Sequence, residues 1–250
     1  MTVVPREWDA VEYDSLPLPH LEWGDRVLAA LSLEGNETVV DVGCGTGRDT
    51  EKVLKRLPSG KLFAFDASEE MLKQFKLRIG DDPRVQTVKV DISKPMAIEV
   101  GANAIMSVAA FHWISDHEVL FENLSRIAQS GCQLVFDCGG VGNIDNIRKV
   151  VDGIIGDEYH ERPWYFADPD STASLLSASG FDVLEASIIP SPIQIDDPKI
   201  FARFLRYVVL GSQIDWIGPE RADWLVNEVA RNLEVPVVDY VRLFVRASKF

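Results

Sequence analysis

Short apolar runs, rich in β-branched residues, alternate along the chain with stretches in which apolar positions recur every three or four residues. The runs predict strands at 38–42, 61–65, 86–90, 103–108 and 132–137. The stretches between them predict helices at 49–57, 68–78 and 116–128. Strands that alternate with helices in this way pair in parallel, so the pattern predicts an α/β fold with helices on both faces of the sheet.

The alternation is less regular at both ends of the chain. Residues 19–30 have helical spacing and follow a segment, 8–14, that carries Trp8 and Tyr13. After Gly140, the pattern predicts helical spacing over 141–159, an aromatic loop at 162–169, a helix at 170–179, a strand at 181–189, a linker at 190–198, helices at 198–210 and 219–233, and a last strand at 240–247.

Three glycines follow the first predicted strand on alternate positions, at Gly43, Gly45 and Gly47. Glycine allows a sharp turn and lets the backbone come into contact with a ligand, which a Cβ would prevent. In the dinucleotide-binding fingerprint the third glycine stands one residue later, so this spacing disfavours a dinucleotide. Taken alone, the glycines are equally typical of a tight turn without a ligand.

Acidic residues stand at the ends of the next two strands. Asp66 ends the second strand, 19 residues after Gly47, and a carboxylate in this place accepts hydrogen bonds from ribose hydroxyls. Asp91 and Ile92 follow the third strand, and the tract that starts at Phe111 follows the fourth. The order of these features predicts an adenosine ligand at the carboxyl edge of the sheet.

This ordered set resembles the class I S-adenosylmethionine-dependent methyltransferases. More narrowly, the Phe-His-Trp-Ile-Ser-Asp tract from Phe111 resembles the His-Trp signature of the small-molecule group that includes trans-aconitate and malonyl carrier-protein methyltransferases. The resemblance covers about residues 8–250 and is firmest over 37–137. It implies a doubly wound, seven-stranded Rossmann-like sheet whose last strand is antiparallel, a helical cap on the substrate side, and S-adenosyl-L-methionine as cofactor.

The resemblance also implies a division of the chain. We expect residues 1–36 to form an N-terminal lid or helix and residues 37–250 to form the methyltransferase domain, with cap elements near 141–166 and 193–235. The aromatic residues of the first segment would equally serve to pack it onto the body of the protein.

The resemblance assigns the cofactor to residues at the ends of the first four strands. They are Asp41, Gly43, Gly45, Gly47, Asp66, Ala67, Asp91, Ile92 and Ser107. Asp41 would lie near the ammonium end of the cofactor, Asp66 would bind the ribose, and Asp91 with the Ile92 N–H would bind the adenine. For Asp41 and Asp91, a carboxylate that caps loop amides is the alternative interpretation.

The acceptor site is expected just beyond the fourth strand. His112 is the catalytic candidate, because a histidine there would hydrogen-bond the acceptor or take its proton, although a structural histidine remains an alternative. Tyr13, Trp113, Trp164 and Arg203 are the candidates for acceptor binding. A carboxylate acceptor needs no base but needs a cationic anchor. Arg203, Arg206, Arg148 and Arg162 are the candidate anchors, and a solvated helix charge is the alternative for each.

Composition limits the partners. The net charge of −14 disfavours binding to nucleic acid, and no apolar run approaches the roughly 18 residues of a membrane helix. Residues 1–14 carry Asp and Glu where a signal peptide needs a basic end and an apolar stretch, so we expect a cytoplasmic protein without a membrane partner. The three cysteines lack metal-ligand spacing with the four histidines, so we expect reduced thiols and no metal. We expect a monomer or homodimer.

The sequence therefore predicts an S-adenosylmethionine-dependent methyltransferase that acts on a small molecule, with the oxygen of a carboxylate as the favoured acceptor. A protein that binds the cofactor without turnover, and a methyltransferase that acts on nitrogen or carbon of a hydrophobic metabolite, remain alternatives. An oxidoreductase with a nicotinamide cofactor is disfavoured by the glycine spacing.

Overall fold

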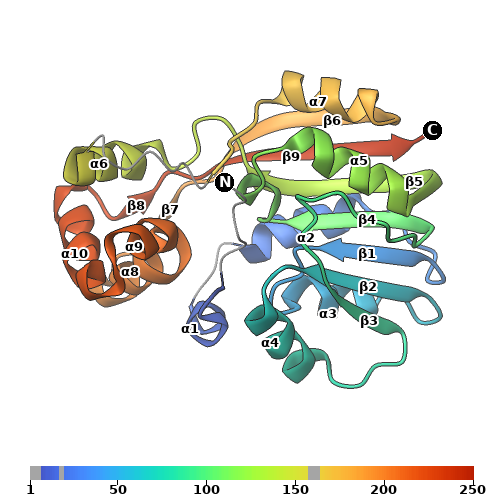
Figure 1. The fold of residues 1–250 in the computed structure, drawn as a ribbon, viewed down its shortest axis with the longest axis horizontal. Coiled ribbons are helices and arrows are strands. Elements are labelled where there is room, and N and C mark those ends of the chain that lie inside the picture. The colour runs from blue at the N-terminus through green and yellow to red at the C-terminus, as the bar shows by residue number, and fades with distance from the viewer. Residues whose placement is uncertain (1–6, 17–19, 157–163) are drawn as a thin grey trace.

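A computed structural model gives the structure of the chain and describes residues 7–16, 20–156 and 164–250 (Figure 1). Its centre is a seven-stranded sheet in the order β3-β2-β1-β4-β5-β9-β6. The strands are β1 (Thr38–Val42), β2 (Lys61–Asp66), β3 (Val85–Lys89), β4 (Ala102–Val108), β5 (Ala128–Gly139), β6 (Phe181–Pro190) and β9 (Val241–Lys249). The first five run parallel, and β9 runs antiparallel to both β5 and β6. The predicted seven-stranded sheet with an antiparallel last strand is confirmed.

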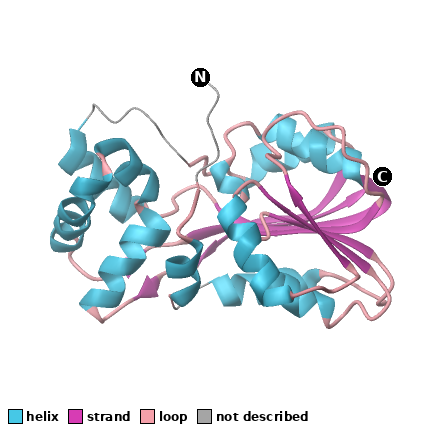
Figure 2. Cartoon of the chain, turned by 60° about the horizontal axis from the view of Figure 1, so that its bottom comes forward, coloured by secondary structure: helices cyan, strands magenta, loops and turns pink. Residues whose placement is uncertain are grey.

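Helices cover both faces of this sheet, as Figure 2 shows. The helices α2 (His20–Ala30), α3 (Arg48–Leu54) and α4 (Glu69–Ile79) pack on one face, and α5 (His117–Ile127) and α7 (Pro169–Ala178) pack on the other. Side chains of a strand point alternately to the two faces, so Leu62 and Ala64 of β2 join the first core while Phe65 joins the second. This alternation is why the apolar runs of the sequence are continuous.

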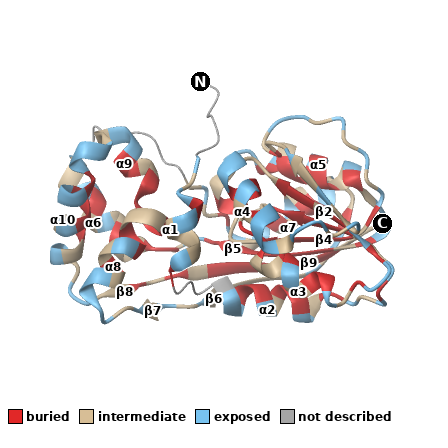
Figure 3. Cartoon of the chain, turned by 90° about the horizontal axis from the view of Figure 1, so that it is seen from below, coloured by how far each residue is buried: buried red, intermediate tan, exposed pale blue. Residues whose placement is uncertain are grey.

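A smaller helical region adjoins one end of the sheet (Figure 1). It comprises α6 (Asp145–Ile155), α8 (Pro198–Phe204), the π-helical turn η3 (Leu205–Val209), α9 (Gly211–Ile217), the turn η4 (Pro219–Arg221), α10 (Ala222–Asn232) and the short strands β7 (Ile193–Gln194) and β8 (Val237–Val238). Buried residues in Figure 3 run along the strands and along the inner sides of these helices. The helices share an apolar cluster that includes Phe204, Leu225 and Val229, and the region includes the residues for which cap elements were predicted; we call it the cap.

Three details of the cap differ from the sequence-based prediction. The single helix expected over 198–210 is divided into α8 and η3, α9 was not predicted, and the linker expected over 190–198 contains β7. The strand β7 exists because Ile193 pairs with Val238, a residue far away in the sequence. Local spacing carries no signal for such a pair.

The segment before α2 contains a short helix, α1 (Ala10–Ser15), which begins where the Asp9 side chain accepts a hydrogen bond from the Glu12 N–H at 3.1 Å. This segment lies between the helical cap and the glycine-containing edge of the sheet (Figure 1). In the part of the chain that the structure describes, no helix has both the length and the apolar character needed to cross a membrane.

Candidate active site

The glycine loop between β1 and α3 lies at the carboxyl edge of the parallel strands. All three glycines have positive φ, at 72° for Gly43, 53° for Gly45 and 84° for Gly47. A Cβ on Gly43 would lie 2.3 Å from the Ala110 Cβ, and one on Gly47 would lie 2.8 Å from the Phe75 ring. A Cβ on Gly45 would meet no atom within 4 Å. Packing therefore accounts for two of the glycines, while Gly45 faces open space of the kind that a ligand requires.

Asp66 holds the loop beside this open space. Its carboxylate accepts hydrogen bonds from the Gly45 N–H and the Ser68 N–H, each at 2.9 Å, and from the Ala67 N–H. Burial raises the pKa of Asp66, and the backbone N–H groups oppose this rise. A carboxylate has about four acceptor positions and three are taken by these N–H groups, so Asp66 retains about one position for a ligand's hydroxyl group.

Asp41 is buried under the glycine loop, 2% exposed. Burial raises its pKa to about 7, although the Thr50 hydroxyl donates a hydrogen bond to the carboxylate, and the nearby charges of Asp49 and Asp66 add to the rise. Among the residues that the structure describes, no cation contributes to keeping the carboxyl group of Asp41 ionised. A cationic ligand group would supply such a partner.

The remaining predicted cofactor residues lie along the same edge of the sheet. Asp91 accepts hydrogen bonds from the Ser93 backbone and hydroxyl and pairs with the Lys94 ammonium at 2.7 Å. Burial opposes ionisation of Asp91, but these partners outweigh it and lower the pKa. The Ser107 hydroxyl donates to the Val42 carbonyl at 2.7 Å and so links β4 to β1.

Two acidic residues that were not among the predicted site residues attach the N-terminal segment across the glycine loop. Asp14 pairs with Arg48 at 2.7 Å and Arg78 at 2.6 Å and accepts a hydrogen bond from the Thr46 hydroxyl. Glu7 accepts a hydrogen bond from the Ser68 hydroxyl at 2.7 Å, at the start of α4. Residues 7–16 are thereby attached to the glycine loop and to the start of α4, and their role as a lid stays a prediction.

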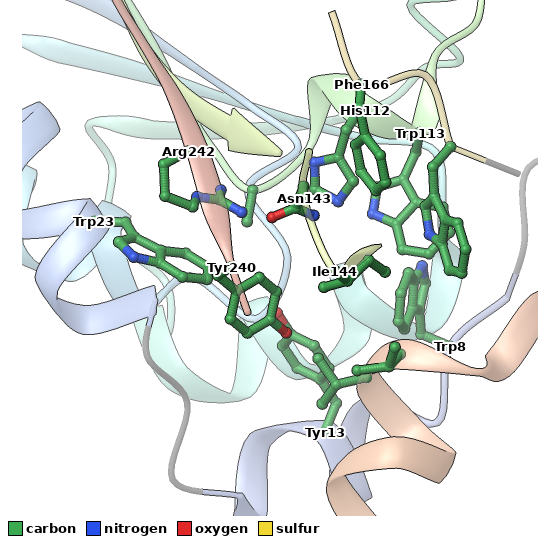
Figure 4. A pocket seen from close by; sticks show the side chains of 14 residues that line it. Trp8, Tyr13, Trp23, His112, Trp113, Asn143, Ile144, Phe166, Tyr240 and Arg242 are labelled. Carbon is green, nitrogen blue, oxygen red and sulfur yellow. The ribbon is translucent and has the colours of Figure 1, made fainter. Parts of the chain in front are cut away.

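Between this segment and the cap lies a pocket in which aromatic side chains predominate (Figure 4). The residues that line it are Trp8, Tyr13, Trp23, Ala109, His112, Trp113, Asn143, Ile144, Trp164, Phe166, Val208, Val209, Tyr240 and Arg242. The enclosed cavity between them is about 40 Å³ and is partly open to solvent. Ligand pockets typically enclose several hundred Å³, so a small molecule can enter only if some of the lining side chains or residues 7–16 move apart.

Three of the four predicted acceptor-binding residues line the pocket, namely Tyr13, Trp113 and Trp164. The fourth, Arg203, does not line the pocket. Its guanidinium pairs instead with Glu12 at 2.6 Å. The other predicted anchors are also absent from the lining: Arg206 pairs with Asp223, Arg148 pairs with Asp145, and Arg162 lies outside the described residues.

His112 lies on the wall of the pocket and is 8% exposed. Its Nδ1 accepts a hydrogen bond from the Gly139 N–H at 3.2 Å. In the neutral ring only one nitrogen carries a proton, so this bond assigns the proton to Nε2. The neutral His112 side chain is thereby set as a hydrogen-bond donor at Nε2.

A buried arginine, Arg242, forms part of the pocket wall and was not among the predicted site residues. Its Nε donates to Asp137 Oδ1 at 2.8 Å, Arg26 donates to the other oxygen of Asp137 at 2.8 Å, and the guanidinium stacks on Trp23 at 3.6 Å from the ring centre. The sequence did hold a signal for it, since Arg242 interrupts the apolar residues of the last predicted strand.

Comparisons with known proteins agree with this geometry. A family model described as a methyltransferase domain matches residues 39–131. The trans-aconitate 2-methyltransferase of Acidovorax sp. (strain JS42) is 32% identical over 50% of this chain and 47% of its own length. The malonyl-(acyl-carrier protein) O-methyltransferase 1 of Ilyobacter polytropus is 33% identical over 44% of this chain and 41% of its own length. The matched part thus spans less than half of each relative.

The fold as a whole is similar to that of mycolic acid cyclopropane synthase CmaA1, solved in complex with SAH. The TM-score is 0.62 at 13% identity, over 98% of this chain and 90% of that one. The likeness therefore extends over the cap as well as the sheet. Residues 39–131 match a methyltransferase domain, and the predicted resemblance of the chain to the class I S-adenosylmethionine-dependent methyltransferases is confirmed.

Proposed function

We propose that the protein transfers a methyl group from S-adenosylmethionine to a small molecule, with a carboxylate oxygen as the acceptor atom. The observation that carries this proposal is the open space at the Gly45 Cβ position beside the Asp66 carboxylate. An adenosine needs backbone that it can approach closely, which Gly45 provides, and a nearby acceptor for the ribose hydroxyls, which Asp66 provides.

Each predicted cofactor residue has a distinct task in this proposal. Asp66 binds the ribose hydroxyls, and Asp91 and Ile92 bind the adenine at the end of β3. Asp41 holds the ammonium group of the cofactor, which provides the cation that its buried carboxyl group lacks. The glycine loop and the beginning of α3 lie against the rest of the cofactor.

When bound, S-adenosylmethionine supplies a methyl group on a positively charged sulfur that departs as a neutral thioether. The protein then has to hold the acceptor in line with that methyl group and exclude water. The aromatic residues of the pocket provide the apolar surroundings, and residues 7–16 close one side of it. No base is required if the acceptor oxygen is already ionised, as a carboxylate is at neutral pH.

The assignment of the His112 proton supports a carboxylate acceptor. The ring accepts a hydrogen bond from the Gly139 N–H at Nδ1 and carries its proton at Nε2. Such a ring can donate a hydrogen bond to an ionised oxygen, but it has no free nitrogen with which to remove a proton from the acceptor. The names of the two relatives also refer to carboxylic acid derivatives, the anion trans-aconitate and the acyl group malonyl. The cytoplasmic location and the oligomeric state stay predictions.

The aromatic lining favours one alternative, a hydrophobic metabolite that is methylated on nitrogen or carbon. Trp8, Trp113 and Trp164 would hold such a molecule without a charged partner. A panel of acids and of uncharged aromatic amines, tested for release of S-adenosylhomocysteine, separates the two acceptor classes. Binding of the cofactor without turnover of either class would favour a non-catalytic protein.

The cofactor site is tested by calorimetric titration with S-adenosylhomocysteine. Asp66→Ala is expected to weaken binding at least fivefold, because a buried hydrogen bond from a ribose hydroxyl loses its acceptor. Asp223→Ala removes an exposed carboxylate of the cap and serves as the matched control with unchanged affinity. Absence of binding to the folded wild-type protein would refute the proposed function.

A further inference from the structure

We propose that Arg242 and Asn143 together form an anion-binding end of the acceptor pocket, so that the acceptor is a carboxylic acid with an apolar body. This inference rests on the proposed function and names the chemical class of the substrate. The carboxylate of the acceptor would contact the Arg242 guanidinium and the Asn143 amide, while its apolar part contacts the aromatic wall.

The charges around Arg242 do not balance. Arg242 and Arg26 both donate to Asp137, so two cations share one anion. Arg26 is partly exposed, whereas the side chain of Arg242 is 1% exposed, as is appropriate for the buried member of the group. Among the described residues that line the pocket, none is Asp or Glu. Because Arg242 shares its only carboxylate partner among these residues with Arg26, the group carries one net positive charge, which favours an anionic ligand beside it.

The orientation of the Arg242 guanidinium leaves some of its N–H groups available to donate hydrogen bonds to a ligand. Asp137 takes the Nε hydrogen at 2.8 Å and, through its backbone carbonyl at 3.4 Å, one hydrogen of Nη2. Stacking on Trp23 at 3.6 Å fixes the plane of the guanidinium. No acceptor among the described residues takes the hydrogens of Nη1. The remaining edge of the fork is therefore held rigidly as a donor pair next to the pocket.

Asn143 supplies the second donor. Its Oδ1 accepts a hydrogen bond from the Val241 N–H at 2.8 Å, which fixes the orientation of the amide and identifies the opposite end as Nδ2. Asn143 is 2% exposed, and its Nδ2 has no acceptor in the described part of the chain. Nδ2 also lies beside Gly139, the residue whose N–H binds His112. Figure 4 shows the Asn143 amide between Arg242 and His112.

The rest of the pocket determines the body of the ligand. Trp8 contacts Trp113 edge to face at 5.2 Å, and Trp164 stacks on Phe166 at 5.9 Å, so flat apolar surfaces face the space. Aromatic or alkenyl groups pack well on such surfaces. The combination of a fixed cation, an amide donor and flat apolar walls is suited to an aryl or alkenyl carboxylic acid.

The experiment compares acids with their uncharged amides on protein saturated with S-adenosylhomocysteine. Calorimetric titrations use benzoate and benzamide, phenylacetate and phenylacetamide, and trans-cinnamate and trans-cinnamamide. We expect at least one acid to bind tenfold or more tightly than its amide, because charge-assisted hydrogen bonds form only with the acid. Equal or weaker binding of every acid would overturn the inference.

Two variants localise the effect. Asn143→Asp keeps an acceptor for the Val241 N–H but replaces the Nδ2 donor with a negatively charged oxygen. Arg242→Lys keeps the positive charge but removes the planar guanidinium with its paired N–H donors. Both are expected to reduce the ratio of acid to amide affinity to about threefold or less. Arg206→Ala, which removes a guanidinium paired with Asp223 on the cap, is the control and should leave the ratio unchanged.

Binding of S-adenosylhomocysteine by each variant shows that it is folded, and Asn143→Asp alone decides the question if Arg242→Lys does not fold. An unchanged ratio in a folded Asn143→Asp protein would overturn the inference while the proposed function stands. A wild-type protein that fails to bind S-adenosylhomocysteine would instead refute the proposed function, and the inference with it.

Discussion

The buried carboxyl group of Asp41 makes a testable connection between cofactor binding and stability. Its pKa is raised by burial from 3.8 to about 7, a difference of about 3 pH units. The folded protein without cofactor therefore binds a proton that the unfolded chain has released between about pH 4 and pH 7. Stability falls as pH rises wherever the folded state binds more protons, and each pH unit corresponds to about 1.36 kcal/mol.

The perturbation is Asp41→Asn, which keeps the shape of the side chain and an acceptor for the Thr50 hydroxyl but cannot ionise. At pH 5 the wild-type group is protonated, so both proteins carry a neutral side chain there. At pH 8 the wild-type group is ionised and buried without a cation. The variant is thus expected to gain about 2–3 kcal/mol of stability relative to wild type on going from pH 5 to pH 8.

Urea denaturation of both proteins at the two pH values, followed by tryptophan fluorescence, measures this difference. Asp223→Asn changes an exposed carboxyl group and is the control with no such gain. A difference between Asp41→Asn and wild type that is the same at pH 5 and pH 8 would refute the argument. At pH 8 the variant should also bind S-adenosylhomocysteine at least tenfold more weakly, because the ammonium group loses its carboxylate.

Three further predictions concern the glycine loop, the lid and His112. Gly45→Ala should weaken binding of S-adenosylhomocysteine at least tenfold and lower the melting temperature by only a few degrees. Gly47→Ala, whose Cβ would contact Phe75, should lower the melting temperature further. Thermal melts and titrations compare the two variants, and equal affinity in Gly45→Ala and wild type would contradict the prediction. Asp14→Asn should speed amide hydrogen exchange of residues 7–16 about tenfold without affecting β1, because it weakens the pairing with Arg48 and Arg78. Mass spectrometry measures exchange in both segments. Unchanged exchange would show that these ion pairs do not hold residues 7–16 in place. His112→Ala should reduce turnover but leave the affinity for S-adenosylhomocysteine nearly unchanged, and an equal loss of both would assign His112 a structural role.

The parts of the molecule that the sequence predicts are those that depend on neighbours in the chain. The strand before Gly43, the loop and α3 follow one another, and the carboxyl ends of parallel strands meet at one edge whatever the side chains are. The positions of Asp41, Asp66 and Asp91 at this edge therefore follow from strand order alone. Their roles in binding remain predictions.

The parts that sequence analysis missed depend on residues that lie far apart in the chain. The Asp137 and Arg242 side chains are 105 positions apart, and those of Asp14 and Arg78 are 64 apart. Arg203 has the helical position expected of an anchor, yet it pairs with Glu12, which is 191 positions away. Periodicity shows which side of a helix is polar, but it gives no information about which charge lies opposite.

The attachment of residues 7–16 to the glycine loop has a kinetic consequence. The same short segment that is fixed by Asp14 on the cofactor side provides Trp8 and Tyr13 to the acceptor pocket. That pocket is complete only while the segment is docked. Under the proposed function we therefore expect the methyl donor to bind before the acceptor, and product-inhibition kinetics would test this order.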